Sequence, residues 1–214
     1  MAASSAPQDS RVLAPHHRLL LEQASGISPD VIAERGWWTA RLWGDLDGLG
    51  FHGTQKLPPN FPALVVPQHD PSGEYTYSVI RYDVTPVRRN GQPMKYIQPK
   101  GVGLRLDVPR RCLEGLKNPE VPLLVTEGAR KADALATHGI VALNTPGVDG
   151  WRSPSAVPDL IGIPLKNRQV ILAYDSDLLT KPPVRRAVEM LARWMEQKGA
   201  AVRIIDWTRL GRAA

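Results

Sequence analysis

The sequence predicts an α/β fold in which a parallel sheet flanked by helices follows a small α+β subdomain. From residue 121 onward, short apolar runs alternate with segments of helical periodicity, which is the pattern of repeated β-α-β units. These runs are largely apolar, as expected for parallel strands that are buried on both faces. Upstream of residue 120, polar and apolar positions alternate between turn residues, which indicates antiparallel strands.

The elements expected in the second half alternate between strand and helix. In chain order they are strand 121–126, helix 128–138, strand 140–143, helix 155–161, strand 169–174, helix 183–197 and strand 200–205. Gly139 and Gly199 each separate a helix from the strand that follows it. A loop rich in Pro and Gly, at 144–154, precedes the short helix.

Composition and turn residues divide the chain into five regions. They are a leader (1–15), a helical module (16–43), a basic and mostly β subdomain (44–119), the α/β domain (120–206) and a tail (207–214). The leader is rich in Ala, Ser and Pro and is expected to be disordered. In the helical module, Pro29 is expected in the first turn of a helix that Gly36 ends. In the β subdomain, Asn90-Gly91 fits a type I′ hairpin turn.

The overall composition bounds the class of protein. A chain of 214 residues with 43% hydrophobic and 22% charged residues resembles an ordinary globular protein. No apolar stretch approaches the ~20 residues needed to cross a bilayer, and the N-terminus lacks the pattern of a secretory signal. The single cysteine, Cys112, excludes an intramolecular disulfide and a cysteine-rich zinc site. We therefore expect a cytoplasmic protein with no membrane partner.

Carboxylates follow two of the predicted buried strands. Glu127 comes directly after the run 121–126, and Asp175 and Asp177 come directly after the run 169–174. Parallel strands side by side would bring these groups to one edge of the sheet, where ligands of such folds bind. Three clustered carboxylates repel one another unless a cation neutralises them, and Mg²⁺ (or Mn²⁺) prefers oxygen ligands. Singly, each residue also fits a structural role as a cap or turn residue, but their joint placement favours a metal site.

Basic residues gather upstream of this predicted site. The stretch from Arg81 to Arg111 holds eight basic and two acidic residues, and such a field favours polyanions such as nucleic acid. A solvated surface that serves solubility is the alternative. Two more cations, in the first turn of the helix after Gly128, are placed to pair with a substrate phosphate. The candidate phosphate-binding residues are Arg81, Lys95, Lys100, Arg105, Arg130 and Lys131.

Two motifs of the second half resemble a known fold family. Leu123-Leu124-Val125-Thr126-Glu127-Gly128 and Leu172-Ala173-Tyr174-Asp175-Ser176-Asp177 are similar to the two acidic motifs of the Toprim fold, which bacterial primases, topoisomerases and some nucleases share. Upstream, Lys95-Tyr96-Ile97-Gln98-Pro99 resembles the lysine segment that precedes the Toprim core of replicative primases. The details are closest to a divergent branch found in plasmid, phage and other mobile-element replication proteins, often ahead of a helicase.

The resemblance implies a Mg²⁺-dependent, primase-like nucleotidyl transferase. Catalysis and metal binding would fall to Glu127, Asp175 and Asp177, and the partners would be single-stranded DNA, nucleoside triphosphates and a replicative helicase. Primases also carry a third acidic group downstream, for which only Asp206 is available here. Two alternatives stay open, a Toprim nuclease and a non-catalytic module that binds single-stranded DNA or a nucleotide.

Aromatic and histidine residues are the remaining candidates for function. Trp37, Trp38 and Trp43 could stack on bases, although two of the three are expected in the core. The five histidines show no metal-ligand spacing in the sequence and are expected to be surface or turn residues; they are His16, His17, His52, His69 and His138.

Overall fold

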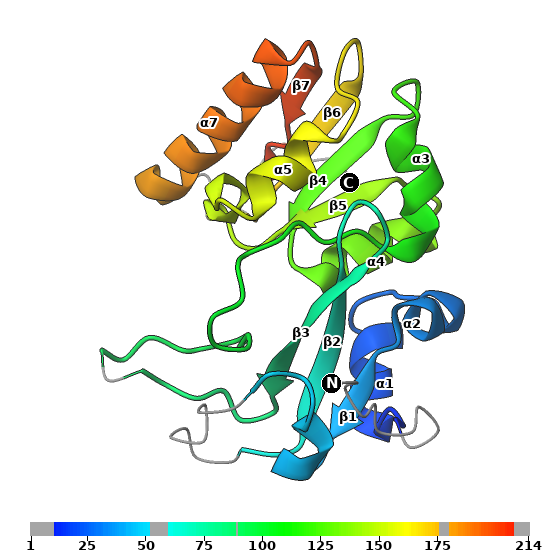
Figure 1. Ribbon diagram of the computed structural model, residues 1–214, viewed down its shortest axis with the longest axis vertical. Helices are drawn as coiled ribbons and strands as arrows, with labels where there is room; N and C mark the ends of the chain where they lie inside the picture. Colours follow the sequence, from blue (N-terminus) through cyan, green and yellow to red (C-terminus); the bar gives the residue numbers. More distant parts are fainter. Residues whose placement is uncertain (1–10, 52–59, 89, 176–179, 208–214) are drawn as a thin grey trace, which may run out of the picture. The chain divides into compact units, whose positions relative to one another are not determined.

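The computed structural model describes residues 11–51, 60–88, 90–175 and 180–207. The chain folds into two compact units (Figure 1). The first unit holds the chain up to Gln68 together with Tyr75–Val102, and the second holds His69–Glu74 together with the chain from Gly103 onward.

The first unit combines short helices with a three-stranded sheet. Its elements are α1 (Pro15–Glu22), α2 (Pro29–Arg35), β1 (Trp38–Ala40), the 3-10 turn η2 (Trp43–Leu46), β2 (Ala63–His69) and β3 (Tyr75–Tyr82). The strands lie in the order β1-β2-β3, and β1 pairs with β2 in antiparallel fashion. As predicted, α2 begins at Pro29 and ends at Gly36, whose φ of 78° is the left-handed conformation that glycine adopts most easily.

The second unit is built on a four-stranded parallel sheet. Its elements are η4 (Arg110–Cys112), α3 (Leu113–Lys117), β4 (Leu123–Glu127), α4 (Ala129–Thr137), β5 (Ala142–Thr145), η5 (Gly150–Arg152), α5 (Ala156–Ile161), β6 (Gln169–Ala173), α7 (Pro182–Gln197) and β7 (Ala201–Ile204). The strand order is β5-β4-β6-β7, and each neighbouring pair is parallel. Figure 1 shows α7 running alongside β7. The predicted fold class is confirmed, with a parallel sheet flanked by helices after a small antiparallel region.

One face of α7 closes the core of this unit. Val188, Leu191 and Met195 recur at helical spacing, and all three are fully buried. They pack in one cluster with the buried strand residues Val125 of β4 and Leu172 of β6. The sheet therefore has an apolar interior, which leaves the strand ends as the places where polar side chains gather. Among the described residues, no helix has the length and apolar character that a membrane crossing requires.

Candidate metal and phosphate site at the strand ends

The strands β4 and β6 are hydrogen-bonded parallel neighbours. Thr126 of β4 lies opposite Ala173 of β6, so Glu127 is the last residue of its strand and Asp175 lies two residues beyond the end of the other. The Thr126 hydroxyl also donates to the carbonyl of Ala173 at 2.9 Å and ties the two ends together. The structure thus brings the Glu127 and Asp175 segments to the same edge of the sheet. Asp177 lies outside the described residues.

A buried polar network fixes the backbone at the turn after Glu127. Gly128 has a φ of 92°, and its N–H donates to Asn144 Oδ1 at 2.6 Å. The Asn144 side chain in turn donates to Asp107 Oδ2 at 3.2 Å, and the backbones of Asn144 and Asp107 exchange two further hydrogen bonds. The other carboxylate oxygen of Asp107 accepts from the N–H of His69 at 3.0 Å. Because Asn144 and Asp107 are both buried, water has little access to this network, which holds the Glu127–Gly128 turn.

A buried tyrosine lies directly before Asp175. The hydroxyls of Tyr174 and Thr145 share a hydrogen bond of 2.7 Å, and Thr145 is the register partner of Glu127 on β5. Burial raises the pKa of Tyr174; the hydrogen bond to Thr145 opposes this rise and the negative charge of Glu127 adds to it. Tyr174 therefore stays neutral, and it positions the chain at the end of β6 through its hydroxyl.

Lys131 of α4 forms an ion pair with Asp175. Both side chains are exposed, so the pair contributes little to stability. The pair shows that Asp175 accepts a cation at this edge of the sheet and that the ammonium of Lys131 reaches it. Arg130, the neighbouring predicted cation, is half-buried in the first turn of the same helix.

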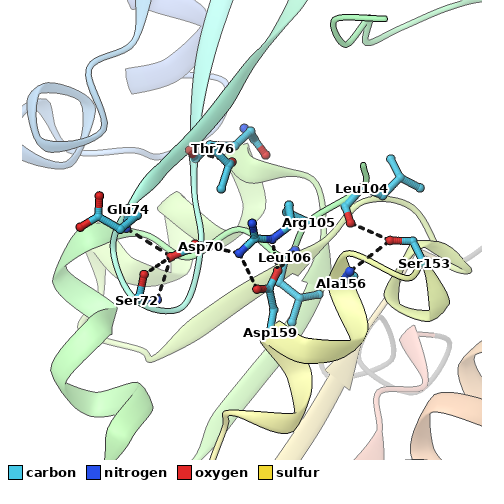
Figure 2. Close-up of polar contacts among 11 residues, drawn as sticks. Asp70, Ser72, Glu74, Thr76, Leu104, Arg105, Leu106, Ser153, Ala156 and Asp159 are labelled. Carbon is cyan, nitrogen blue, oxygen red and sulfur yellow. Dashed lines mark hydrogen bonds and ion pairs between the residues drawn. The ribbon is translucent and has the colours of Figure 1, made fainter. Parts of the chain in front are cut away.

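Arg105, another predicted phosphate ligand, is held by two carboxylates of its own unit. Figure 2 shows its guanidinium between Asp159, to which it donates twice at 2.7 Å, and Asp70, to which it donates at 2.8 Å. Burial alone would raise the pKa of Asp70, but hydrogen bonds from Ser72 and Glu74 and the charge of Arg105 together lower it. Asp70 is therefore ionised and matches the charge of Arg105. Nε and Nη2 of Arg105 are engaged inside the unit.

The remaining predicted cations lie in the first unit. Lys95 and Lys100 are exposed, whereas Arg81 of β3 is half-buried. Trp37 and Trp38 are buried, and Trp43 packs against the same core edge-on to Phe61. The expectation that two of the three tryptophans belong to the core is confirmed, and neither of these two offers a face to a base.

The histidines differ from the prediction. His17 and His69 are buried, so the expectation that they are surface or turn residues is wrong for these two. His17 bonds through both ring nitrogens, to Thr39 and to Asp83, and these bonds offset the cost of removing its imidazole from water. His16 and His138 are exposed, and His52 lies outside the described residues. Sequence reasoning also missed Asn144 and Asp107, although a polar Asn144-Thr145 pair at the end of an apolar strand was a usable signal.

Comparison of the sequence with known proteins finds a match in the second half. Residues 114–213 match the family model described as a domain of unknown function (DUF3854). An uncharacterized protein of Picosynechococcus sp. is 33% identical in a match of 107 residues, and the match covers 43% of this chain. The match spans only 11% of the length of that relative, which is a much longer protein.

Comparison of the structure with solved structures finds primases. The zinc-binding and RNA polymerase domains of Aquifex aeolicus primase are similar with a TM-score of 0.62 at 18% identity, over 90% of this chain and 49% of that one. A DnaG primase catalytic domain bound to single-stranded DNA is similar with a TM-score of 0.59 at 18% identity, over 92% of this chain and 67% of that one. The primase fragment of the bacteriophage T7 primase-helicase is similar with a TM-score of 0.50 at 17% identity, over 96% of this chain and 73% of that one. At such identities the likeness establishes a shared fold with primase catalytic cores.

Proposed function

We propose that this chain is a Mg²⁺-dependent nucleic-acid phosphoryl-transfer domain that performs primase-like nucleotidyl transfer. The observation that supports it most is the placement of Glu127 and Asp175 at the ends of two hydrogen-bonded parallel strands. This placement occurs in a fold that is shared with primase catalytic cores. Ligand sites of parallel sheets form at such strand ends.

The donor set fits a hard divalent cation. Glu127 and Asp175 offer carboxylate oxygens, which Mg²⁺ and Mn²⁺ prefer, and Asp177 adds a third by its place in the sequence. When bound, the ion supplies a Lewis acid for phosphate oxygens. Glu127 is the residue proposed to act as an acid or base in the transfer, or to serve as a ligand. The Asn144 network holds the turn that carries Glu127 and so sets the position of its carboxylate.

Lys131 is proposed to change partners when substrate binds. Its ammonium is paired with Asp175, where it balances the charge that a metal ion would otherwise balance. Binding of a cation by Asp175 would release Lys131 at the N-terminal end of α4. There the ammonium, Arg130 and the positive end of the helix dipole favour a nucleotide phosphate.

Single-stranded DNA is the proposed template. Arg81, Lys95 and Lys100 belong to a basic segment whose field attracts a polyanion. One DnaG primase catalytic domain of the same fold was solved with single-stranded DNA. We propose that Arg105 instead ties the second unit together through Asp159 and Asp70, because its Nε and Nη2 are engaged there.

We further propose that the domain works in the replication of a mobile element, beside a helicase. The motif resemblance to plasmid and phage replication proteins supports this assignment. In the Picosynechococcus protein the matched segment is a small part of a longer chain, which fits a domain that is joined to others.

The test is synthesis of primers on single-stranded DNA from labelled nucleoside triphosphates, with and without Mg²⁺. Glu127→Gln and Asp175→Asn should each lower the yield by roughly two to three orders of magnitude, because each removes charge stabilisation of the transition state. Glu114→Gln is the matched control, since Glu114 is an exposed carboxylate of α3 that pairs with Lys117, three residues along the same helix. It should retain full yield.

The same assay separates the alternatives. Cleavage of DNA that depends on Glu127 and Asp175, without primer synthesis, would identify a nuclease. DNA binding that is unchanged in both variants, with no metal-dependent product in any protein, would identify a non-catalytic binding module and would contradict the proposal.

A further inference from the structure

Three side chains of the first unit converge on one point. Nε2 of His16 lies 2.8 Å from Asp83 Oδ2, and Nε2 of His17 lies 2.7 Å from Asp83 Oδ1. One ligand atom of each residue falls within 4.8 Å of the others. Consecutive helical residues point about 100° apart, so neighbouring side chains do not normally face a common partner. The convergence of both rings of α1 on one carboxylate is therefore a specific arrangement.

The other ring nitrogen of His17 is hydrogen-bonded to a threonine. Nδ1 lies 2.8 Å from Thr39 Oγ1, and this hydroxyl also accepts the N–H of Ala14 at 2.8 Å. Thr39 and His17 are both buried. A histidine that ligates a metal commonly donates its second N–H to such a partner, which fixes the orientation of the ring and leaves Nε2 for the ion.

The exposure of the trio also suits a metal ion. The side chains of His16 and Asp83 are 52% and 33% exposed, so an ion can reach them from solvent.

We propose that His16, His17 and Asp83 form a binding site for a divalent transition-metal ion such as Zn²⁺. Two imidazole nitrogens and a carboxylate oxygen make three ligands of a tetrahedral site, and the fourth position is left to water. The ion takes the place of the proton between each Nε2 and Asp83, and each neutral imidazole then carries its proton on Nδ1, which in His17 donates to Thr39 Oγ1. The exposed His16 and Asp83 move apart slightly to admit the ion. Bound there, the ion joins α1 to the chain that leaves β3. This site prefers a softer ion than the carboxylates of the second unit, because its donors are mostly nitrogen.

The test uses Co²⁺ and Zn²⁺ with the full chain after treatment with a chelator. Wild type should bind one tetrahedral Co²⁺ per chain, seen by its visible absorption, which Zn²⁺ removes. Zn²⁺ should also raise the melting temperature, since it binds the folded state. His16→Ala and Asp83→Asn should each weaken binding by at least about tenfold, because losing even an outer-shell partner of a ligand costs that much.

Three controls locate the ion. His138→Ala removes an exposed histidine of the second unit, and His52→Ala removes the remaining histidine of the first. The double variant Glu127→Gln/Asp175→Asn removes the carboxylates at the strand ends. All three proteins should retain the affinity for Co²⁺, whatever the outcome of the primer assay.

Two results would overturn the proposal. One is the absence of a Co²⁺ spectrum in wild type, or a spectrum that His16→Ala and Asp83→Asn leave unchanged. The other is loss of the spectrum in the double carboxylate variant alone. Asp83→Asn preserves the size of the side chain, so it answers the question even where His16→Ala alters the fold. In either case the trio would be a hydrogen-bonded cluster that holds α1 in place.

Discussion

Two charged arrangements of the second unit differ in their access to water. Arg105 pairs with Asp159 and Asp70, whose side chains are 6% and 11% exposed. Lys131 pairs with Asp175, and these side chains are 44% and 61% exposed. A buried carboxylate has little water to replace a lost partner, whereas exposed charges exchange partners at low cost. The comparison indicates that the first arrangement stabilises the fold and that the second is suited to bind a ligand.

The largest effect is expected from Asp159→Ala. This change removes two hydrogen bonds from Arg105 and one from the N–H of Leu106, and it leaves the guanidinium with Asp70 alone. Hydrogen bonds to charged groups contribute about 1.5–3 kcal/mol each, and the half-exposed Arg105 can recover part of this from water, so we expect a loss of about 2–3 kcal/mol. Denaturation in urea measures it.

Asp149→Ala is the matched control for this experiment. Asp149 also pairs with an arginine, Arg152, but both side chains are exposed. The free energy of unfolding should fall by less than about 1 kcal/mol. Equal losses in the two variants would show that exposure does not separate the two kinds of pair, and the comparison would fail.

The next effect concerns Asn144, which has a buried network on one side and the proposed catalytic turn on the other. Asn144→Ala leaves the N–H of Gly128 and the carboxylate of Asp107 each without one partner. We expect a loss of about 1–2 kcal/mol in stability from the unsatisfied buried groups. We also expect primer yield to fall at temperatures where the variant is fully folded, because the turn that carries Glu127 is no longer held.

Mg²⁺ affinity shows whether Asn144 positions the Glu127 turn or only stabilises the fold. Mg²⁺ affinity should weaken in Asn144→Ala and stay at the wild-type value in Asp159→Ala, although the latter is the less stable protein. Unchanged Mg²⁺ affinity in both would mean that Asn144 serves stability alone.

The sequence predicted the ends of the parallel strands well, but it did not predict the polar side chains that pair with one another next to them. The apolar runs 121–126 and 169–174 became β4 and β6 with small changes in their bounds, since buried parallel strands have a strong apolar pattern. The position of Glu127 and Asp175 at the sheet edge follows from that pattern. The pairs Asn144–Asp107 and Arg105–Asp159 join residues 37 and 54 positions apart. Which polar residues meet over such distances depends on the packing of loops, for which a single sequence holds no periodic signal.

Long separation in the sequence also explains why the cluster of His16, His17 and Asp83 was not predicted. His17 and Asp83 are 66 positions apart, and their contact depends on how α1 packs within the first unit. A search for ligand spacing along the chain finds only adjacent His16 and His17, and adjacent residues of a helix are not expected to share an ion. The convergence is visible only once Asp83 is placed in space.

A smaller effect is expected at Gly128, where the constraint is backbone conformation. Its φ of 92° disfavours any residue with a Cβ, although no described residue other than its chain neighbours has an atom within 4 Å of the place that a Cβ would occupy. Gly128→Ala should therefore cost about 1 kcal/mol. Gly162→Ala is the control, because Gly162 has a helical φ of −69° and only ordinary contacts, and it should be neutral or slightly stabilising. Thermal melting of both variants checks the difference, and equal stability would show that the turn relaxes.

The smallest effect on stability is expected from a change at Asp175, which should nevertheless abolish Mg²⁺ binding. Asp175→Asn breaks an exposed ion pair, so the free energy of unfolding without metal should change by less than about 1 kcal/mol. Removal of a carboxylate that Glu127 repels offsets part of even this loss. Mg²⁺ binding, followed by calorimetry, should disappear. Lys131→Met should leave stability equally unaffected and should strengthen Mg²⁺ binding, since the ammonium no longer competes for Asp175, while it weakens binding of nucleoside triphosphates. A large loss of metal-free stability in Asp175→Asn would mean that this carboxylate holds the fold as Asp159 does, and the proposed site would lose its central ligand.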